Sequence, residues 1–216
     1  MFTKIKTLLL NTIFPRNSFE KKIGEIDLNT FIKESGKFSV HEYIGVNYFF
    51  DYSNQFVRNS IHSLKYKRNK KIALWYGEIL FDYLIGESYE DNNSIDNKPI
   101  ITIIPSSKSR MQKRGWNQCE LILDEIKRLD KNNYFEYNKN NLVKNRNTES
   151  QTKMRNKKDR EKNVSGSFSI IKPEVFFNKT VILIDDVTTT GSTIKEAGRL
   201  LKNTGAKEVR LITFAH

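Results

Sequence analysis

The sequence predicts an α/β protein with a mostly parallel sheet flanked by helices and a small N-terminal extension. Residues 181–184 are apolar without alternation, which is typical of a central strand covered on both faces. Apolar side chains then recur at helical spacing from Ile194 to Leu201. A second apolar run at residues 100–104 is also followed by a helical segment. Such alternation favours parallel strands, because each helix carries the chain back across the sheet.

The remaining elements follow from the same kinds of pattern. Apolar residues at helical spacing in the first turns of the chain predict an amphipathic helix that packs on the domain. In chain order we then expect a strand at 43–50, one long helix at 61–85, a polar loop at 87–98, a strand at 100–104, a helix at 116–129, a strand near 142 and 143, a mobile basic segment, strands at 168–171 and 180–185, a helix at 193–203 and a strand at 208–214, all completing one sheet. Gly205 follows the last helix, where glycine commonly ends helices.

An acidic pair and a loop of hydroxyls follow the apolar strand at 181–184. Asp185 and Asp186 come at its carboxyl end, beyond which ligands bind in open α/β sheets. Carboxylates accept hydrogen bonds from sugar hydroxyls. The loop at 188–193 offers threonine and serine hydroxyls, and Gly191 lets backbone amides turn inward. The loop also opens a helix whose N-terminus attracts an anion, so we predict a site for a phosphorylated sugar.

Residues 181–193 resemble the phosphoribosyl pyrophosphate (PRPP) motif of the type I phosphoribosyltransferases. The resemblance implies a type I phosphoribosyltransferase-like fold, in which Asp185 and Asp186 form the catalytic pair that holds the ribose hydroxyls. It further implies that the 5-phosphate is bound by Val187, Thr188, Thr189, Thr190, Gly191, Ser192 and Thr193. The structural alternative is a strand that ends in a solvated acidic turn, with Thr193 as a helix cap.

A second loop follows the strand at 100–104. Its small residues allow a close backbone approach, and its cations suit a pyrophosphate. By the same resemblance, the pyrophosphate is bound by Ser106, Ser107, Lys108 and Arg110. Residues 114–117 follow soon after. As an alternative to a role at the ligand site, they could have a purely structural role as the start of a helix, with Asn117 capping it and Trp116 packing beside it.

Further segments resemble the ComF (ComFC/GntX-like) family of competence proteins, namely Ile-His-Ser-Leu-Lys-Tyr-Lys at 61–67, Arg-Gly-Trp-Asn-Gln at 114–118 and a spaced pattern over 148–168. The resemblance covers residues 43–216, which we expect to form the phosphoribosyltransferase-like domain. Many ComF-like proteins carry a four-cysteine zinc knuckle near the N-terminus, but this chain has Cys119 as its single cysteine. We therefore expect no zinc and no metal ligands, and residues 1–42 would be a degenerate knuckle region.

Positive charge is concentrated in blocks. The chain has a formal net charge of +12, and residues 58–71 contain six Lys/Arg and no acidic residue. Basic blocks with aromatic neighbours are typical of single-stranded nucleic acid binding. Candidate contacts are Lys65, Lys67, Arg68, Arg114, Arg155 and Arg160. The alternative is a solvated helix face that only maintains solubility.

Two functions remain open at this stage. The ComF resemblance implies a cytoplasmic protein of DNA uptake and natural transformation, with PRPP, single-stranded DNA and competence-machinery proteins as partners. The alternative is an active phosphoribosyltransferase, a pentosyl-transferring enzyme that uses Mg²⁺ with PRPP and an unidentified nucleobase or amine acceptor. No apolar run approaches the roughly 18 residues that a transmembrane helix needs, so we expect no membrane span.

Overall fold

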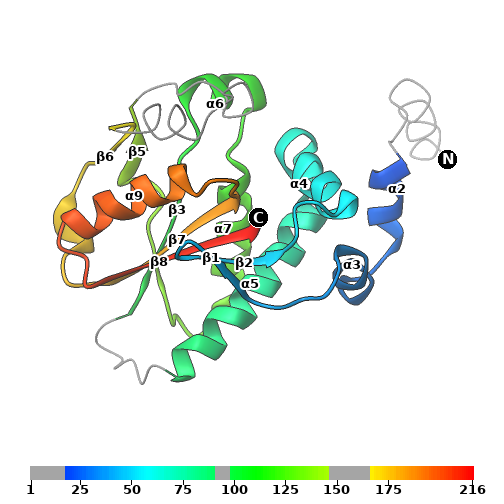
Figure 1. Cartoon of the computed structure of the whole chain (residues 1–216), viewed down its shortest axis with the longest axis horizontal. Helices are drawn as coiled ribbons and strands as arrows, with labels where there is room; N and C mark the ends of the chain where they lie inside the picture. Colours follow the sequence, from blue (N-terminus) through cyan, green and yellow to red (C-terminus); the bar gives the residue numbers. More distant parts are fainter. Residues whose placement is uncertain (1–17, 91–97, 146–165) are drawn as a thin grey trace.

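The computed structural model describes residues 18–90, 98–145 and 166–216 (Figure 1). The main sheet has six strands in the order β1-β2-β8-β7-β3-β4. These strands are β1 (His41–Tyr43), β2 (Val46–Phe50), β3 (Ile100–Ile103), β4 (Glu136–Tyr137), β7 (Thr180–Val187) and β8 (Glu208–Ala215). Neighbouring strands are parallel except for β1, which pairs antiparallel with β2. The expected α/β class with a mostly parallel sheet is therefore confirmed.

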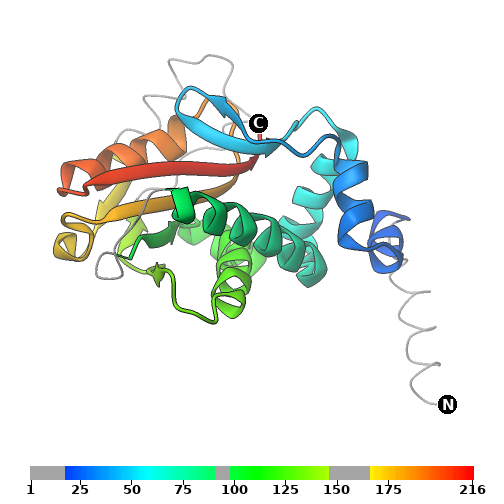
Figure 2. The same ribbon diagram turned by 90° about the horizontal axis from the view of Figure 1, so that it is seen from below.

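Helices cover both faces of the sheet (Figure 2). One face packs on α5 (Lys70–Glu90) and α7 (Gln118–Leu129), while α9 (Ser192–Asn203) lies on the other. Successive residues of β7 alternate between the two cores: Ile182 and Ile184 belong to the first, and Val181 and Leu183 to the second. This double burial explains why the strand reads as a continuous apolar run.

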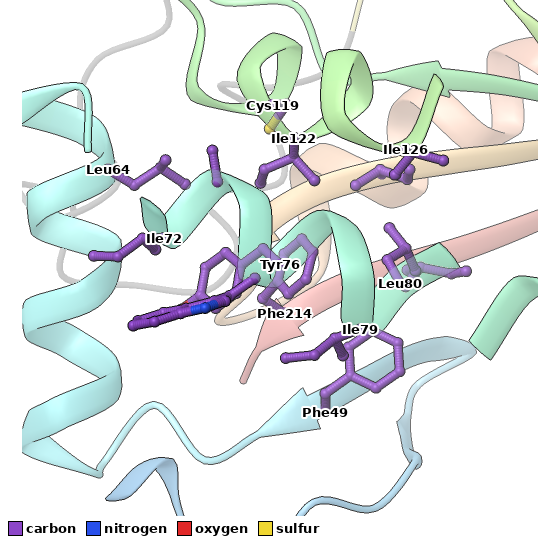
Figure 3. Packing of buried hydrophobic residues seen from close by; sticks show 14 of the residues in the cluster. Phe49, Leu64, Ile72, Tyr76, Ile79, Leu80, Cys119, Ile122, Ile126 and Phe214 are labelled. Carbon is purple, nitrogen blue, oxygen red and sulfur yellow. The ribbon is translucent and has the colours of Figure 1, made fainter. Parts of the chain in front are cut away.

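The first core fixes helix α4 (Gln55–Lys67) beside the carboxyl ends of the strands. The ring of Tyr76 on α5 stacks on Phe214 of β8 with centroids 4.2 Å apart. The Tyr76 hydroxyl lies 2.5 Å from the hydroxyl of Ser60 on α4. Figure 3 shows Tyr76 next to Phe214, on the side of α5 that packs against the sheet. Packing and a buried hydrogen bond thus determine where α4 sits relative to the sheet.

The expectation of one long helix over 61–85 was wrong. The structure has two helices, because Arg68 adopts a left-handed conformation (φ 51°) that ends α4. The side chain of Asn69 then accepts hydrogen bonds from the backbone amides of Lys71 and Ile72 and starts α5. Asn54 likewise starts α4 by accepting from the amide of Phe56, earlier than expected.

The strand expected over 43–50 is a hairpin, because Ile44 (φ 52°) and Gly45 (φ 77°) form a tight turn between β1 and β2. The expectation that the segments near 142 and 168–171 complete the main sheet was also wrong. Strands β5 (Leu142–Lys144) and β6 (Phe168–Ile170) form a separate antiparallel pair. The 3-10 helix η2 (Pro173–Phe176) then leads to β7.

Several short elements were not predicted. They are α2 (Ser18–Glu25), α3 (Leu28–Ser35), α6 (Lys108–Arg114) and β4. Phe19, Ile23 and Phe31 of the N-terminal helices are buried in the first core. The amphipathic helix expected before residue 17 and the basic segment at 146–165 lie outside the described residues. Among the helices that the structure describes, none is long and apolar enough to cross a membrane.

Candidate functional site

The loops after β3 and β7 open at the same edge of the sheet, because the two strands are parallel neighbours with Ile103 opposite Ile184. A cavity of about 410 Å³ lies at this edge. Its walls come from the segment before and along α4, the loop after β3, α6, α7, β5, the end of β7, the loop after β7 and the start of α9. The lining residues are Tyr52, Ile61, His62, Lys65, Tyr66, Ile104, Pro105, Ser106, Arg110, Arg114, Gln118, Lys144, Asp185, Asp186, Val187, Thr189 and Thr193. Residues from the segments at 61–67, 105–118 and 185–193 therefore meet in one place.

The acidic pair lies at the carboxyl end of β7, just before its last residue. Asp186 is 3% exposed, and its Oδ2 lies 2.8 Å from Nζ of Lys65. Oδ1 of Asp185 accepts a hydrogen bond from the backbone amide of Asp186 at 2.9 Å and lies 3.7 Å from Sγ of Cys119. The solvated acidic turn considered above is thus excluded for Asp186, whose carboxylate is buried against a lysine.

Burial and the neighbouring carboxylate of Asp186 raise the pKa of Asp185 to about 7. The positive charges of Lys65 and Lys144 and the hydrogen bond from the Asp186 amide act in the opposite direction. Burial alone would lower the pKa of Lys65, but the charge of Asp186 and the hydrogen bond to it dominate, so this pKa is raised. Lys65 is therefore a cation at neutral pH, and Asp185 is poised to change its charge there.

The loop after β7 has the form of an anion site. The Thr188 amide donates to the carbonyl of Ala215 in β8, which anchors the loop to the sheet. The hydroxyls of Thr190 and Ser192 lie 2.7 Å apart. Gly191 precedes α9 in a left-handed conformation (φ 72°), and no side chain caps the helix. The first turn of α9 thus points its partial positive charge at the loop.

Gly191 also meets the β1–β2 hairpin. A Cβ atom at Gly191 would lie 2.7 Å from Cδ1 of Ile44, which occupies the hairpin tip. Gly191→Ala is therefore expected to lower the free energy of unfolding by about 1–2 kcal/mol, since it adds a left-handed alanine as well as this contact. We also expect weaker phosphate binding, because the loop must shift. Thermal unfolding and phosphate-ligand calorimetry measure the two effects.

Gly86→Ala is the matched control for Gly191→Ala. Gly86 lies within α5, and a Cβ there would meet nothing within 4 Å. This substitution should leave the protein as stable as before, or more stable by about 0.5–1 kcal/mol, because alanine favours a helix. Equal effects of the two substitutions would contradict a constrained role for Gly191.

Only some of the residues expected to bind pyrophosphate line the cavity. Ser106 and Arg110 line the cavity, whereas Lys108 is exposed and is not among the lining residues. Ser107 is 4% exposed and caps α6, accepting from the Arg110 amide at 3.4 Å. Asn117 caps α7 by accepting a hydrogen bond from the Cys119 amide, as expected for the structural role of residues 114–117.

The candidate nucleic-acid contacts do not lie on one common surface. Lys65 lies inside the cavity, while Lys67 and Arg68 are exposed at the end of α4. The Arg114 guanidinium lies 4.5 Å from the centre of the Tyr66 ring and donates to its hydroxyl at 3.0 Å. Tyr66 is 51% exposed, so this pair forms an aromatic and cationic rim. Arg155 and Arg160 lie outside the described residues.

Lys144 is a cavity residue that the sequence analysis missed. Burial and the charge of Arg110 lower the pKa of Lys144 to about 8. Its position next to Leu142 and Val143 marked only a strand, and nothing in that pattern indicated that the strand edge reaches the ligand site. Tyr52 and His62 were missed as well. Tyr52 lies between β2 and α4, where no element was expected, and His62 lies on a helix whose cavity-facing side was not predicted.

A family model described as a phosphoribosyl transferase domain matches residues 70–216. This chain belongs to the phosphoribosyl transferase domain family. The residues matched by the phosphoribosyl transferase model include the loops after β3 and β7 and the acidic pair. Helix α4 precedes the match, so the cavity wall that carries Lys65 and Tyr66 comes from outside it.

Curated relatives connect this phosphoribosyl transferase domain with competence proteins. Competence protein F of Haemophilus influenzae is 35% identical over 111 residues, which cover 50% of this chain and 46% of that protein. Competence protein ComFC of Streptococcus pneumoniae is 34% identical over 112 residues, or 52% of this chain and 46% of that protein. DNA utilization protein YhgH of Escherichia coli is 25% identical over 151 residues, which cover 70% of this chain and 63% of that protein. The chain thus matches about half to three fifths of each relative, and the resemblance to the ComF proteins is confirmed.

Proposed function

We propose that this protein binds PRPP in the cavity and single-stranded DNA on the adjacent basic surface, and that it acts in DNA uptake and natural transformation in the cytoplasm. The observation that carries the proposal is the meeting of the acidic pair, the hydroxyl loop and several cations in one cavity. The names of the relatives support the biological part, since they refer to competence and to DNA utilization.

The chemistry of the cavity favours PRPP over the end of a DNA strand. Two neighbouring carboxylates are suited to accept hydrogen bonds from two sugar hydroxyls. PRPP carries free 2- and 3-hydroxyls, whereas the deoxyribose at the 5-phosphate end of a DNA strand lacks the first and has the second esterified. We therefore place PRPP in the cavity and DNA on its rim, where Tyr66 and Arg114 offer a stacking surface.

Mg²⁺ fits this site as a companion of the ligand. Among the described residues, no group of three or more His, Cys, Asp or Glu is placed to hold a metal ion, and Asp186 is already paired with Lys65. Mg²⁺ prefers phosphate oxygens with few protein ligands, so PRPP would provide most of its contacts. There it would neutralise the pyrophosphate, and Arg110 and Lys144 would add charge from the protein.

The proposal is tested by titrating the purified protein with Mg·PRPP and, separately, with a labelled single-stranded oligonucleotide over a salt series. We expect saturable PRPP binding and DNA binding that weakens steeply with salt. Absence of PRPP binding would refute the cavity assignment. Absence of DNA binding would refute the DNA part alone.

A second candidate function is phosphoribosyl transfer to an acceptor, and the aromatic wall of the cavity favours it. Tyr52, His62 and Tyr66 line the cavity and offer faces for a planar acceptor. In that reaction an acceptor nitrogen would form a bond to C1 of the ribose while the C1–oxygen bond breaks, and pyrophosphate would leave with the bonding electrons. Release of pyrophosphate only when a nucleobase or amine is added would support this function.

Binding of Mg·PRPP is expected to strengthen as pH rises through about 7. Because the pKa of Asp185 is raised to about 7, its accepting, ionised form predominates only above that pH. Calorimetry between pH 5.5 and 8.5 measures this dependence. The ligand's phosphates also titrate, and Lys144, with a pKa of about 8, loses its charge at the upper end of this range. Asp185→Asn is therefore the control: its profile should lose the rise near pH 7 and retain the contributions of the ligand and of Lys144. Parallel profiles for both proteins would contradict a role for Asp185.

A further inference from the structure

Lys65 and Lys67 lie on opposite sides of α4 although both belong to the same basic run. Lys65 follows Ile61 by one helical turn, and both residues line the cavity. The Lys65 side chain is only 19% exposed, while Lys67 is exposed to solvent. Sequence reasoning grouped the two lysines as DNA contacts, but helical geometry directs one of them into the ligand site.

The Lys65–Asp186 pair is an unusual element for a cavity wall. Removing a lysine from water is unfavourable unless a partner compensates, and well-packed apolar residues commonly stabilise a fold at least as well as a buried ion pair. The ion pair is short, at 2.8 Å, and one of its members belongs to the predicted ribose-binding pair. This combination indicates a role at the ligand site rather than in stability alone.

Other charged and titratable groups also face this pair. Lys144 from β5 and Arg110 from α6 line the same cavity, and Cys119 of α7 lies against Asp185. Tyr76 of α5 and Tyr52 before α4 complete the surroundings, and the acidic charge contributes to raising the pKa of Tyr76 and Lys65. Among the cations in these described surroundings, Lys65 is the one that forms an ion pair with the acidic residues.

We propose that Lys65 is a positioning residue of the ribose site, where its ammonium group orients Asp186 as a hydrogen-bond acceptor and offsets the charge of the acidic pair. This inference rests on the proposed binding of PRPP. It assigns to the cavity a residue that lies outside the matched phosphoribosyl transferase domain. The cavity would then depend on α4 for its charge balance as well as for its wall.

The test measures Mg·PRPP affinity between pH 5.5 and 8.5 for the wild type, Lys65→Met, Lys65→Arg and Lys70→Met. Removing the positive charge should raise the pKa of Asp185 further, since Lys65 acts to lower it. Lys65→Met is therefore expected to bind about tenfold more weakly near pH 7, as one unit of pKa corresponds to a factor of ten, and to recover affinity as pH rises. Lys65→Arg should keep the wild-type profile. Lys70 is exposed at the start of α5 and serves as the control.

The outcomes separate this inference from the proposed function. If the wild type fails to bind PRPP, the proposed function is refuted and the inference falls with it. If the wild type binds but Lys65→Met has an unchanged profile, or is weaker by the same factor at every pH, only the role of Lys65 is refuted. A uniform loss is what a merely structural role would produce.

A measurement on the wild type keeps the inference testable even if Lys65→Met does not fold. The side-chain ¹⁵N resonances of the lysines can be followed while Mg·PRPP or a single-stranded oligonucleotide is added. We expect PRPP to shift the Lys65 signal and leave the Lys70 signal in place. A Lys65 signal that responds to DNA and not to PRPP would overturn the assignment and return Lys65 to the nucleic-acid surface.

Discussion

Asp185→Asn and Asp186→Asn should each weaken Mg·PRPP binding strongly without abolishing it, because an amide replaces one acceptor oxygen of the proposed ribose site with a donor. The two substitutions are expected to have opposite effects on stability. Asp185 has a raised pKa, so its ionisation disfavours the folded state, and Asp185→Asn should stabilise the protein by at most about 4 kcal/mol. This gain should be absent near pH 4, grow as pH rises, and be complete above about pH 7.

Asp186→Asn should destabilise the protein by about 3 kcal/mol, because it leaves the largely buried Lys65 without its ionic partner. Thermal unfolding at pH 4 and pH 8, combined with calorimetry at pH 8, distinguishes the two residues. Unchanged PRPP affinity in either variant would refute the assignment of the acidic pair. Equal changes in melting temperature would contradict the asymmetric surroundings of the two carboxylates.

Replacing Lys67 and Arg68 should weaken single-stranded DNA binding and flatten its salt dependence. Each lost phosphate contact on a single strand reduces the logarithmic salt slope by about 0.7, so two contacts correspond to about 1.4. Lys67→Ala is combined with Arg68→Asn, because asparagine tolerates the left-handed conformation at residue 68 (φ 51°). Fluorescence anisotropy over a salt series measures the slope.

Lys131→Ala with Lys207→Ala is the control for this DNA experiment. These lysines are exposed and precede β4 and β8, at the edge of the sheet opposite the cavity. The control pair removes the same net charge and should leave most of the slope intact. Equal losses in both double variants would show that DNA responds to overall charge and not to the end of α4.

The acidic pair could be recognised from sequence because its signal is local. The apolar run of β7 reflects burial on both faces, and the carboxyl end of a parallel strand is where ligands bind. The adjacency of β3 and β7 agrees with the expectation that both loops serve one ligand. A continuous segment therefore contained enough physical information to predict a central parallel strand with an acidic pair at its carboxyl end.

The direction of Lys65 could not be predicted, because it depends on where α4 starts and stops. Neither boundary carries proline or glycine: the helix begins at the side chain of Asn54 and ends where Arg68 adopts a left-handed conformation. Merging α4 with α5 into one helix removes the break that positions α4 over the cavity. Lys144 was missed for a related reason, since the separate β5–β6 pair is defined by long-range contacts.

The position of β8 has a consequence for synthesis. β8 lies between β2 and β7, and Ala215 at its end accepts the hydrogen bond that anchors Thr188 of the phosphate loop. Strands that are far apart in sequence must therefore come together before this loop has its backbone partner, and such long-range pairing is slow. A growing chain that already contains residues 181–193 still lacks the backbone partner of Thr188, so the cavity is assembled only in chains in which β8 has been synthesised and inserted.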